Sequence, residues 1–260
     1  MDLVERGDAG AYRHPWETAR FKFVSKLIAE YGDRESSVVV DIGSGDGFFL
    51  ESLRKTLRDG QFVGLDIALT DDEVRELNAG ASDGVRFCNS PEQLEQLLSR
   101  PADVILLLDV IEHIADDHTF LRDLAKRPFM SYETVTIVTV PAFWSLHTSH
   151  DEYLKHFRRY SLSQARRALS DTGFKTIAEG YFFFSLLIPR VVSKLRESIF
   201  SPKRQYGIGR WRSGRAVTKT IEAALLTDAA IGRALARALP ARVALPARRR
   251  AARRPAHGLR

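Results

Sequence analysis

Residues 38–47 read Val-Val-Val-Asp-Ile-Gly-Ser-Gly-Asp-Gly, an apolar β-branched run that ends in an acid and continues with a glycine at every second position. The apolar run predicts a buried strand, and the glycines predict a turn whose backbone a ligand can approach closely. An ordinary turn from strand to helix needs only one glycine, so this turn is typical of a binding site. Asp41 places a negative charge where the strand stops, which favours a ligand that carries a cation or hydroxyl groups.

Outward from this turn, helical and strand-like patterns alternate along the chain. Apolar residues at helical spacing predict a helix over 16–31, before the strand. The turn Ser161-Leu-Ser-Gln164 fits a capping box that opens a helix ending near Thr172. This alternation predicts an α/β fold with a doubly wound, mostly parallel sheet and helices on both faces. Further helices are expected over 48–57, 71–78, 91–98, 116–126 and 221–239, and further strands over 61–66, 85–88, 103–109, 134–140 and 174–181.

Three acids stand at the carboxyl ends of predicted strands: Asp41, Asp66 and Asp109. In an open parallel sheet, the ligand lies beyond these ends, beside the strand where the winding direction reverses. The sequence therefore predicts a ligand site between the first, second and fourth strands.

Composition and charge divide the chain into a body and a tail. The 260 residues carry a formal charge of +6, yet residues 233–260 hold nine arginines and no acid, which leaves about −3 on residues 1–232. We expect one domain over 1–232, with a core over 14–190 and a helical addition over 190–232, followed by a flexible arginine-rich tail over 233–260. The tail could also bind anionic lipid or nucleic acid.

The expected location is the cytoplasm. Cys88 is the single cysteine, so no internal disulfide forms, and the N-terminus lacks the apolar core of a signal peptide. The apolar segment 181–192 is too short to span a bilayer. It is expected to be core, acceptor pocket or an interfacial anchor, and the last of these would put the protein at the inner face of the membrane.

Three motifs resemble those of class I S-adenosylmethionine-dependent methyltransferases: Asp-Ile-Gly-Ser-Gly-Asp-Gly (41–47), Phe-Val-Gly-Leu-Asp (62–66) and Leu-Asp-Val-Ile-Glu-His (108–113). The resemblance covers about residues 14–190 and implies a seven-stranded, Rossmann-like sheet and S-adenosylmethionine as methyl donor. A seventh strand has only two poor candidates, 182–185 and 242–246. The rival dinucleotide fingerprint spaces its glycines as G-x-G-x-x-G, whereas this chain has G-x-G-x-G.

The resemblance assigns roles around the glycine turn. The turn would lie under the methionine part of the cofactor, with Asp41 near its ammonium group, and Asp66 would accept hydrogen bonds from both ribose hydroxyls. Asn89 stands where related enzymes usually carry an acid for the adenine amine. Arg20 would meet the methionine carboxylate, or else be a solvated helix residue. The implied cofactor-binding set is Asp41, Gly43, Gly45, Gly47, Asp66, Ile67, Asn89, Asp109 and Val110.

The segment 141–161 carries three histidines, two acids, two arginines and several aromatic residues after the fifth strand, where acceptor chemistry belongs. A histidine suits proton removal at neutral pH. We expect His150 to be the base, with Asp151 or another carboxylate orienting it, and His156 to be the second choice. Alternatively, His156 and the arginines only pin the loop to the body. The expected acceptor-binding residues are His147, Arg158, Arg159, Tyr160 and His113.

Glu112 and His113 match a pair in the branch that resembles ubiquinone-type O-methyltransferases, some of which use a divalent metal. With Asp109 they would form a metal site, but we favour the alternative that they cap a helix and brace the loop. The segment after the fifth strand resembles a bacterial subfamily from cell-surface glycan and lipid pathways.

The sequence therefore predicts methyl transfer from S-adenosylmethionine to a hydroxyl of a small-molecule, glycan or lipid-linked acceptor. One alternative is an RNA methyltransferase, which is disfavoured because the body is acidic and the fourth strand lacks the Asn/Asp-Pro-Pro-aromatic pattern of base methylation. The other is a non-catalytic protein that only binds S-adenosylmethionine.

Overall fold

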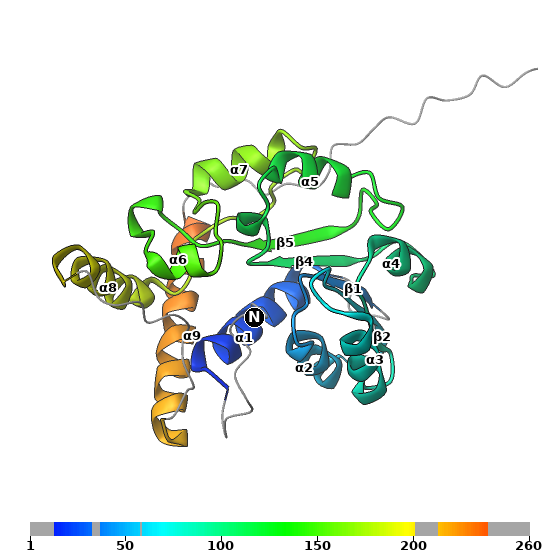
Figure 1. The fold of residues 1–260 in the computed structure, drawn as a ribbon, viewed down its shortest axis with the longest axis horizontal. Coiled ribbons are helices and arrows are strands. Elements are labelled where there is room, and N and C mark those ends of the chain that lie inside the picture. Colours follow the sequence, from blue (N-terminus) through cyan, green and yellow to red (C-terminus); the bar gives the residue numbers. More distant parts are fainter. Residues whose placement is uncertain (1–12, 33–36, 58, 201–212, 239–260) are drawn as a thin grey trace, which may run out of the picture.

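The computed structural model describes residues 13–32, 37–57, 59–200 and 213–238 (Figure 1). Its centre is a parallel sheet of five strands in the order β3-β2-β1-β4-β5. The strands are β1 (Ser37–Ile42), β2 (Gly60–Leu65), β3 (Val85–Cys88), β4 (Val104–Leu108) and β5 (Val135–Thr139). The order reverses between β1 and β4, so the switch point lies beside the glycine turn, as the sequence predicts.

Helices cover both faces of the sheet, and each face has its own apolar core (Figure 1). The first core receives side chains from α1 (Pro15–Tyr31), α2 (Phe48–Thr56), α3 (Asp71–Gly80) and α9 (Arg215–Ala238). The second receives them from α4 (Pro91–Leu97), α5 (Asp117–Leu124) and α7 (Leu162–Ser170). The prediction of a doubly wound α/β fold is therefore confirmed.

The fourth strand shows why the pattern forms a central strand. All five of its residues are buried. Leu106 and Leu108 point into the first core, and Ile105 and Leu107 point into the second. A strand that is apolar on both faces is stable only between two helical layers.

Local signals set the helix boundaries close to their predicted places. The side chain of His14 caps α1 by accepting from the N–H of Trp16 at 3.3 Å. The predicted capping box is present: the Ser161 hydroxyl accepts from the N–H of Gln164, whose side chain accepts from the N–H of Ser161. Such a reciprocal pair satisfies two donors that a helix start would otherwise leave open.

The predicted sixth strand over 174–181 is wrong for the described residues, because the five-stranded sheet does not include this segment, in which Ile177 alone forms a bridge. Its apolar side chains pack outside the sheet: Phe174 lies against the second core, and the Tyr181 ring stacks on Phe143 at 5.0 Å between centroids. The next two residues also pack through their side chains. The Phe182 ring stacks on Phe23 of α1 at 4.7 Å between centroids, and Phe183 is 6% exposed with a φ of 59°. Phe183 thus turns the chain into the short 3-10 helix η4 (Phe184–Leu186).

The same turn excludes 182–185 as a seventh strand, and the other candidate, 242–246, lies outside the described residues. The helical addition consists of α8 (Leu187–Phe200) and α9. Because α9 runs to Ala238, the expected boundary at residue 232 falls inside a helix, and most of the expected tail lies outside the described residues. Within the described part of the chain, no helix is long and apolar enough to cross a membrane.

Candidate functional site

The glycine turn between β1 and α2 holds a backbone shape that other residues rarely adopt. The φ angles of Gly43, Gly45 and Gly47 are 79°, 56° and 76°. A Cβ at Gly43 would lie 2.7 Å from the Val110 Cγ2, and one at Gly47 would lie 2.5 Å from the Phe87 ring. Both the left-handed angles and the close neighbours require glycine, and we call this turn the glycine cradle.

Asp66, which follows β2, is fastened to this cradle. Its Oδ2 accepts from the N–H of Gly45 at 2.9 Å, and its Oδ1 accepts from the N–H of Ala68 at 3.0 Å. The carboxylate therefore lies at the rim of the turn. The following residue, Ile67, is 78% exposed. Asn89, beyond β3, donates to the Leu69 carbonyl at 3.2 Å and so lies against the same loop.

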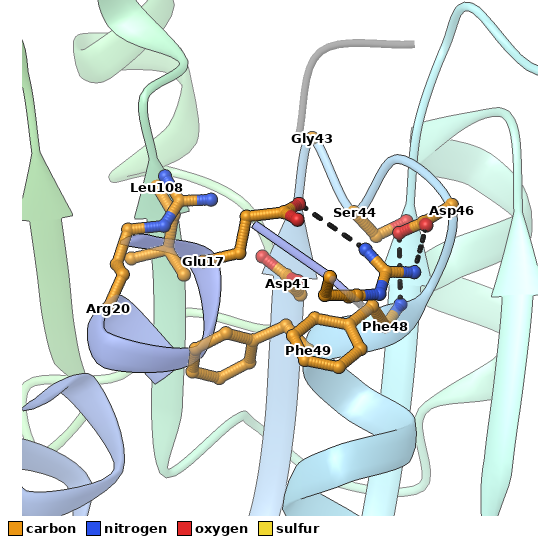
Figure 2. Close-up of a pocket in the computed structure, with 10 residues that line it drawn as sticks. Glu17, Arg20, Asp41, Gly43, Ser44, Asp46, Phe48, Phe49 and Leu108 are labelled. Carbon is orange, nitrogen blue, oxygen red and sulfur yellow. Dashed lines mark hydrogen bonds and ion pairs between the residues drawn. The ribbon is translucent and has the colours of Figure 1, made fainter. Parts of the chain in front are cut away.

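Asp41 forms the floor of the pocket (Figure 2). It is only 3% exposed, and its Oδ1 has no hydrogen-bond partner in the described part of the chain. Burial raises the pKa of Asp41 to about 7, against the opposing effect of the Arg20 charge. A buried carboxylate without a partner is costly. A positively charged ammonium group would supply the missing donor and favour the ionised form.

Helix α1 covers this floor with charged side chains. Arg20 is 7% exposed, pairs with Asp109 and stacks on the Trp16 ring at 4.4 Å, so it is not a solvated helix residue. Asp109, after β4, also accepts from the Thr139 hydroxyl at 3.0 Å. Its φ of 58° is uncommon outside glycine, and such positions collect at functional sites. The carboxyl ends of β1, β4 and β5 and the cover of α1 thus meet here.

No role is predicted from the sequence for three charged residues that line this pocket: Arg13, Glu17 and Asp46. Arg13 donates to Glu17 at 3.3 Å, pairs with Asp46 and lies 3.9 Å above the centre of the Phe48 ring. The spacing of Arg13 and Glu17, four residues apart, was a helical-pair signal. The position of Asp46 inside the glycine turn was a second signal, because an acid in a binding turn can attract an arginine.

Asp151 lies in the segment 141–161, at the start of α6 (Ser149–Tyr153); we call this segment the acceptor segment, after the role that the sequence predicts for it. It is fully buried and accepts from His156 Nδ1 at 2.8 Å, Arg159 Nε at 2.8 Å and Arg190 of α8 at 2.6 Å. Burial alone would raise the pKa of Asp151, but these donors lower it far below its usual range. The carboxylate is therefore a permanent anion that fixes a histidine and two arginines.

The two candidate bases differ in their surroundings. His156 has the carboxylate partner, although the sequence favours His150 for it. Burial and the Arg190 charge lower the pKa of His150. His147 stacks on Trp144 at 4.5 Å, and its carbonyl accepts from Lys194 of α8. Of the three histidines, His156 thus has the Asp-His arrangement that holds an imidazole for proton transfer.

Arg158 and Tyr160 lie in a second cluster around Asp117. Tyr160 is 4% exposed and donates to Asp117 Oδ2 at 2.6 Å, and burial followed by this bond raises its pKa. Arg158 pairs with Asp117 and donates to the Ala115 carbonyl at 2.5 Å. These contacts tie the segment to α5, as the loop-pinning alternative predicts for Arg158.

Glu112 lies beside His156, in the 3-10 helix η2 (Ile111–His113). It is fully buried, and neither carboxylate oxygen has a hydrogen-bond partner in the described part of the chain. Burial, followed by the charge of Asp109, raises the pKa of Glu112 well above its usual value. Its main chain does brace the loop, because its carbonyl accepts from the N–H of Phe157 at 2.8 Å.

Glu112, His113 and His156 each offer one ligand atom, and these atoms lie within 4.8 Å of one another. One carboxylate and two imidazoles are a donor set that suits a divalent transition metal. From the sequence, Asp109 is expected to be the third ligand of such a site, whereas the structure brings His156 to Glu112 and His113. Asp109 links this cluster to the pocket beside the glycine turn, because it pairs with Arg20 and its charge also raises the pKa of Glu112.

Comparisons with known proteins agree with this geometry. Residues 16–179 match the family model of a methyltransferase domain. The ubiquinone biosynthesis O-methyltransferase of Maricaulis maris is 30% identical over 122 residues, covering 44% of this chain and 47% of the relative. The enzyme of the same name from Caulobacter vibrioides is 27% identical over 128 residues, covering 44% and 48%. This chain thus spans about half the length of the curated relatives it matches.

Solved structures share the fold. A putative sarcosine dimethylglycine methyltransferase from Galdieria sulphuraria superposes with a TM-score of 0.50 at 15% identity, covering 84% of this chain and 81% of the other. The plantazolicin methyltransferase BpumL, solved in complex with SAH, gives a TM-score of 0.50 at 15% identity, covering 73% and 80%. At this identity the likeness extends to the fold alone.

Proposed function

This chain belongs to the methyltransferase domain family, and from that premise we propose that it transfers the methyl group of S-adenosylmethionine to a hydroxyl of a small-molecule, glycan or lipid-linked acceptor. The observation that carries the proposal is the buried carboxylate of Asp41, whose Oδ1 lacks a partner beneath the glycine cradle. A cationic amino acid group fits this position, and a pyrophosphate does not, because two like charges would meet. The relatives named for ubiquinone biosynthesis support oxygen as the accepting atom.

In this proposal the residues divide between the two substrates. Asp41 and the glycine turn hold the methionine part, and Asp66 accepts from the ribose hydroxyls in place of its present N–H donors. Ile67, Asn89 and Val110 lie around the adenosine part. When bound, the donor supplies a methyl group on a positively charged sulfur. The acceptor oxygen forms the new bond as the carbon–sulfur bond breaks, and S-adenosylhomocysteine is released.

The remaining task is to remove the hydroxyl proton. We assign it to His156, because Asp151 holds its Nδ1 and leaves Nε2 to take the proton. General-base catalysis of this kind contributes roughly 100-fold or more. His150 is the second candidate. His147, Arg159 and His113 would contact the acceptor in this proposal.

The same histidine also belongs to the set that could hold a divalent cation. Glu112, His113 and His156 would be its ligands, and the cation would act as a Lewis acid that lowers the pKa of the acceptor hydroxyl. The unpartnered oxygens of Glu112 favour this second version. The two versions differ in one property, since only the second loses activity to a chelator.

Calorimetry with S-adenosylmethionine and S-adenosylhomocysteine tests the donor site. We expect the wild type to bind both and Asp66→Asn to lose at least about tenfold in affinity, because the amide has no negative charge and replaces one of the two acceptor oxygens with an NH2 donor. Asp72→Asn is the matched control, since the Asp72 side chain is 82% exposed on α3. If the wild type binds neither compound at millimolar concentration, the proposal is wrong.

Transfer of a labelled methyl group tests the acceptor class. A catechol, a methyl glycoside, a polyprenyl phenol and transfer RNA would be offered in separate assays, each with and without EDTA. We expect label on at least one hydroxyl compound and a loss of about 100-fold in kcat for His156→Gln. Label on RNA alone would refute the proposal. Donor binding without transfer to any acceptor would favour the non-catalytic alternative.

A further inference from the structure

Helix α8 is held to the body by its polar side chains. Arg190 donates to Asp151 at 2.6 Å, and Glu197 accepts from the hydroxyl of Ser149 at 2.9 Å. Lys194 donates to a main-chain carbonyl of the same segment. These three α8 residues are spaced four and three apart, so they share one face of the helix. The polar face of α8 is thus the face that packs against the acceptor segment.

The opposite face of α8 is apolar and exposed. Its residues recur at the spacing of a helical face, and Figure 1 shows α8 projecting at the edge of the molecule beyond α6. An amphipathic helix on a globular domain normally turns its apolar side to the core, so this helix has the reverse orientation. We call this face the α8 stripe; its members and exposed fractions are Ile188 (72%), Val191 (42%), Val192 (50%), Leu195 (55%) and Ile199 (69%).

A contiguous apolar face of this kind indicates an interaction site. Single exposed apolar side chains are common, but five on one face of a 14-residue helix are not. The helix is about 21 Å long, at 1.5 Å per residue, which is shorter than the roughly 30 Å of a bilayer core. A partner must therefore cover the stripe from the side, and α8 cannot span a membrane.

Arg196 beside the stripe and the charge of the sequence that follows α8 favour one kind of partner. Arg196 is exposed and borders the stripe, four residues after Val192. Residues 198–221 contain six lysines and arginines and no acid, and residues 233–260 contain nine arginines and no acid. An apolar helix face bordered by an arginine, in a stretch of sequence that is strongly basic, is typical of a helix that lies in the interface of an anionic membrane. A second copy of the chain would bring its own Arg196 to the contact, where like charges repel.

We propose that the α8 stripe inserts into the headgroup region of an anionic phospholipid bilayer, with α8 parallel to the surface. The contacts of Arg190, Lys194 and Glu197 then place the acceptor segment beside the lipid. This binding does not depend on methyl transfer and is measured separately from it. A chain without any methyltransferase activity would still bind the vesicles, so failure of one proposal is distinguishable from failure of the other.

Co-sedimentation of the full chain with vesicles tests the proposal. Equimolar phosphatidylcholine and phosphatidylglycerol would be compared with phosphatidylcholine alone. We expect binding to the anionic vesicles that weakens with salt, and a fall of at least about tenfold in the partition coefficient for the double variant Ile188→Gln and Leu195→Gln. The control is the double variant Val217→Gln and Ile231→Gln on α9, which are 49% and 56% exposed and should bind like the wild type.

Equal binding of the α8 variant and the wild type would overturn the proposal. So would a stable dimer in the absence of lipid that the α8 variant dissociates, because a second copy would then cover the stripe. If the variant fails to fold, hydrogen exchange of the wild type decides the matter. Protection over 187–199 on adding anionic vesicles supports the proposal, and unchanged exchange there contradicts it.

Discussion

Replacing Asp41 by asparagine should make the protein more stable at alkaline pH and less able to bind its donor. The carboxyl is 3% exposed, with one oxygen lacking a partner. Its burial raises the pKa from 3.8 to about 7. Asparagine keeps the size of the side chain and removes the charge, so the variant isolates the free energy of ionising this buried group.

The magnitude follows from the difference in pKa. Between pH 3.8 and about 7 the unfolded chain has released the proton and the folded chain has kept it, so the free energy of unfolding of the wild type falls as the pH rises. Roughly three pKa units at 1.36 kcal/mol each give a fall of about 4 kcal/mol, which is complete above about pH 7. The free energy of unfolding of the Asp41→Asn variant should not fall in this way with pH, because asparagine has no proton to release. Any effect of the amide on packing is the same at every pH.

Urea unfolding of both proteins at about pH 4 and about pH 8 measures this difference. An unpaired amide in the buried site costs about 1–3 kcal/mol. The variant should therefore be less stable than the wild type at pH 4 and more stable by about 1–3 kcal/mol at pH 8. Calorimetry should show at least about a tenfold loss of affinity for S-adenosylmethionine. Parallel pH dependences of the two proteins would refute a neutral, buried Asp41.

Three further predictions concern other parts of the site. Gly47→Ala should lower the free energy of unfolding by about 2–4 kcal/mol, because its φ is 76° and the new Cβ would meet the Phe87 ring; Gly80→Ala, with nothing within 4 Å, should change it by less than about 1 kcal/mol in the same urea titration. Asp151→Asn should lower the free energy of unfolding by about 3–5 kcal/mol, because Arg159 and Arg190 lose the anion that they pair with. The control Asp123→Asn, at an exposed position, should change it by less than about 1 kcal/mol. Because burial raises the pKa of Glu112, the free energy of unfolding of the wild type falls as the pH rises above 4.5. Between about pH 5 and pH 8 the melting temperature of Glu112→Gln should therefore rise relative to that of the wild type. If Glu112→Gln instead melts lower than the wild type only when a divalent metal is added, Glu112 belongs to a cation site.

The glycine turn and the strand-end acids were accessible from sequence because the chemistry is local. Alternate glycines between an apolar run and a helix leave few backbone shapes, and Asp41, Asp66 and Asp109 follow strands whose parallel order brings their ends together. The sixth strand was predicted wrongly from the same kind of pattern. Its aromatic residues, Phe174 and Tyr181, have no local signal that distinguishes a strand from an irregular segment whose side chains pack against other parts of the chain.

The partner of Asp151 could not be predicted from sequence. Neighbouring residues on a helix point in different directions, so the adjacent His150 is poorly placed for it. Lys155, with a φ of 58°, ends α6 with a turn that brings the N–H of His156 to the Asp151 carbonyl at 2.9 Å and its ring to the carboxylate. Arg190 reaches the same carboxylate from α8, a helix 39 residues further along the chain.

By itself, the sequence determined the doubly wound sheet and the glycine turn, because periodicity and glycine spacing act over a few residues, and its motifs resembled the family that the comparisons confirm. Only the tertiary structure decided which groups are buried without partners, which histidine holds a carboxylate, and which face of α8 is exposed. Those properties depend on contacts between distant segments. Desolvation and pairing at Asp41, Glu112 and Asp151 arise only when the layers have packed.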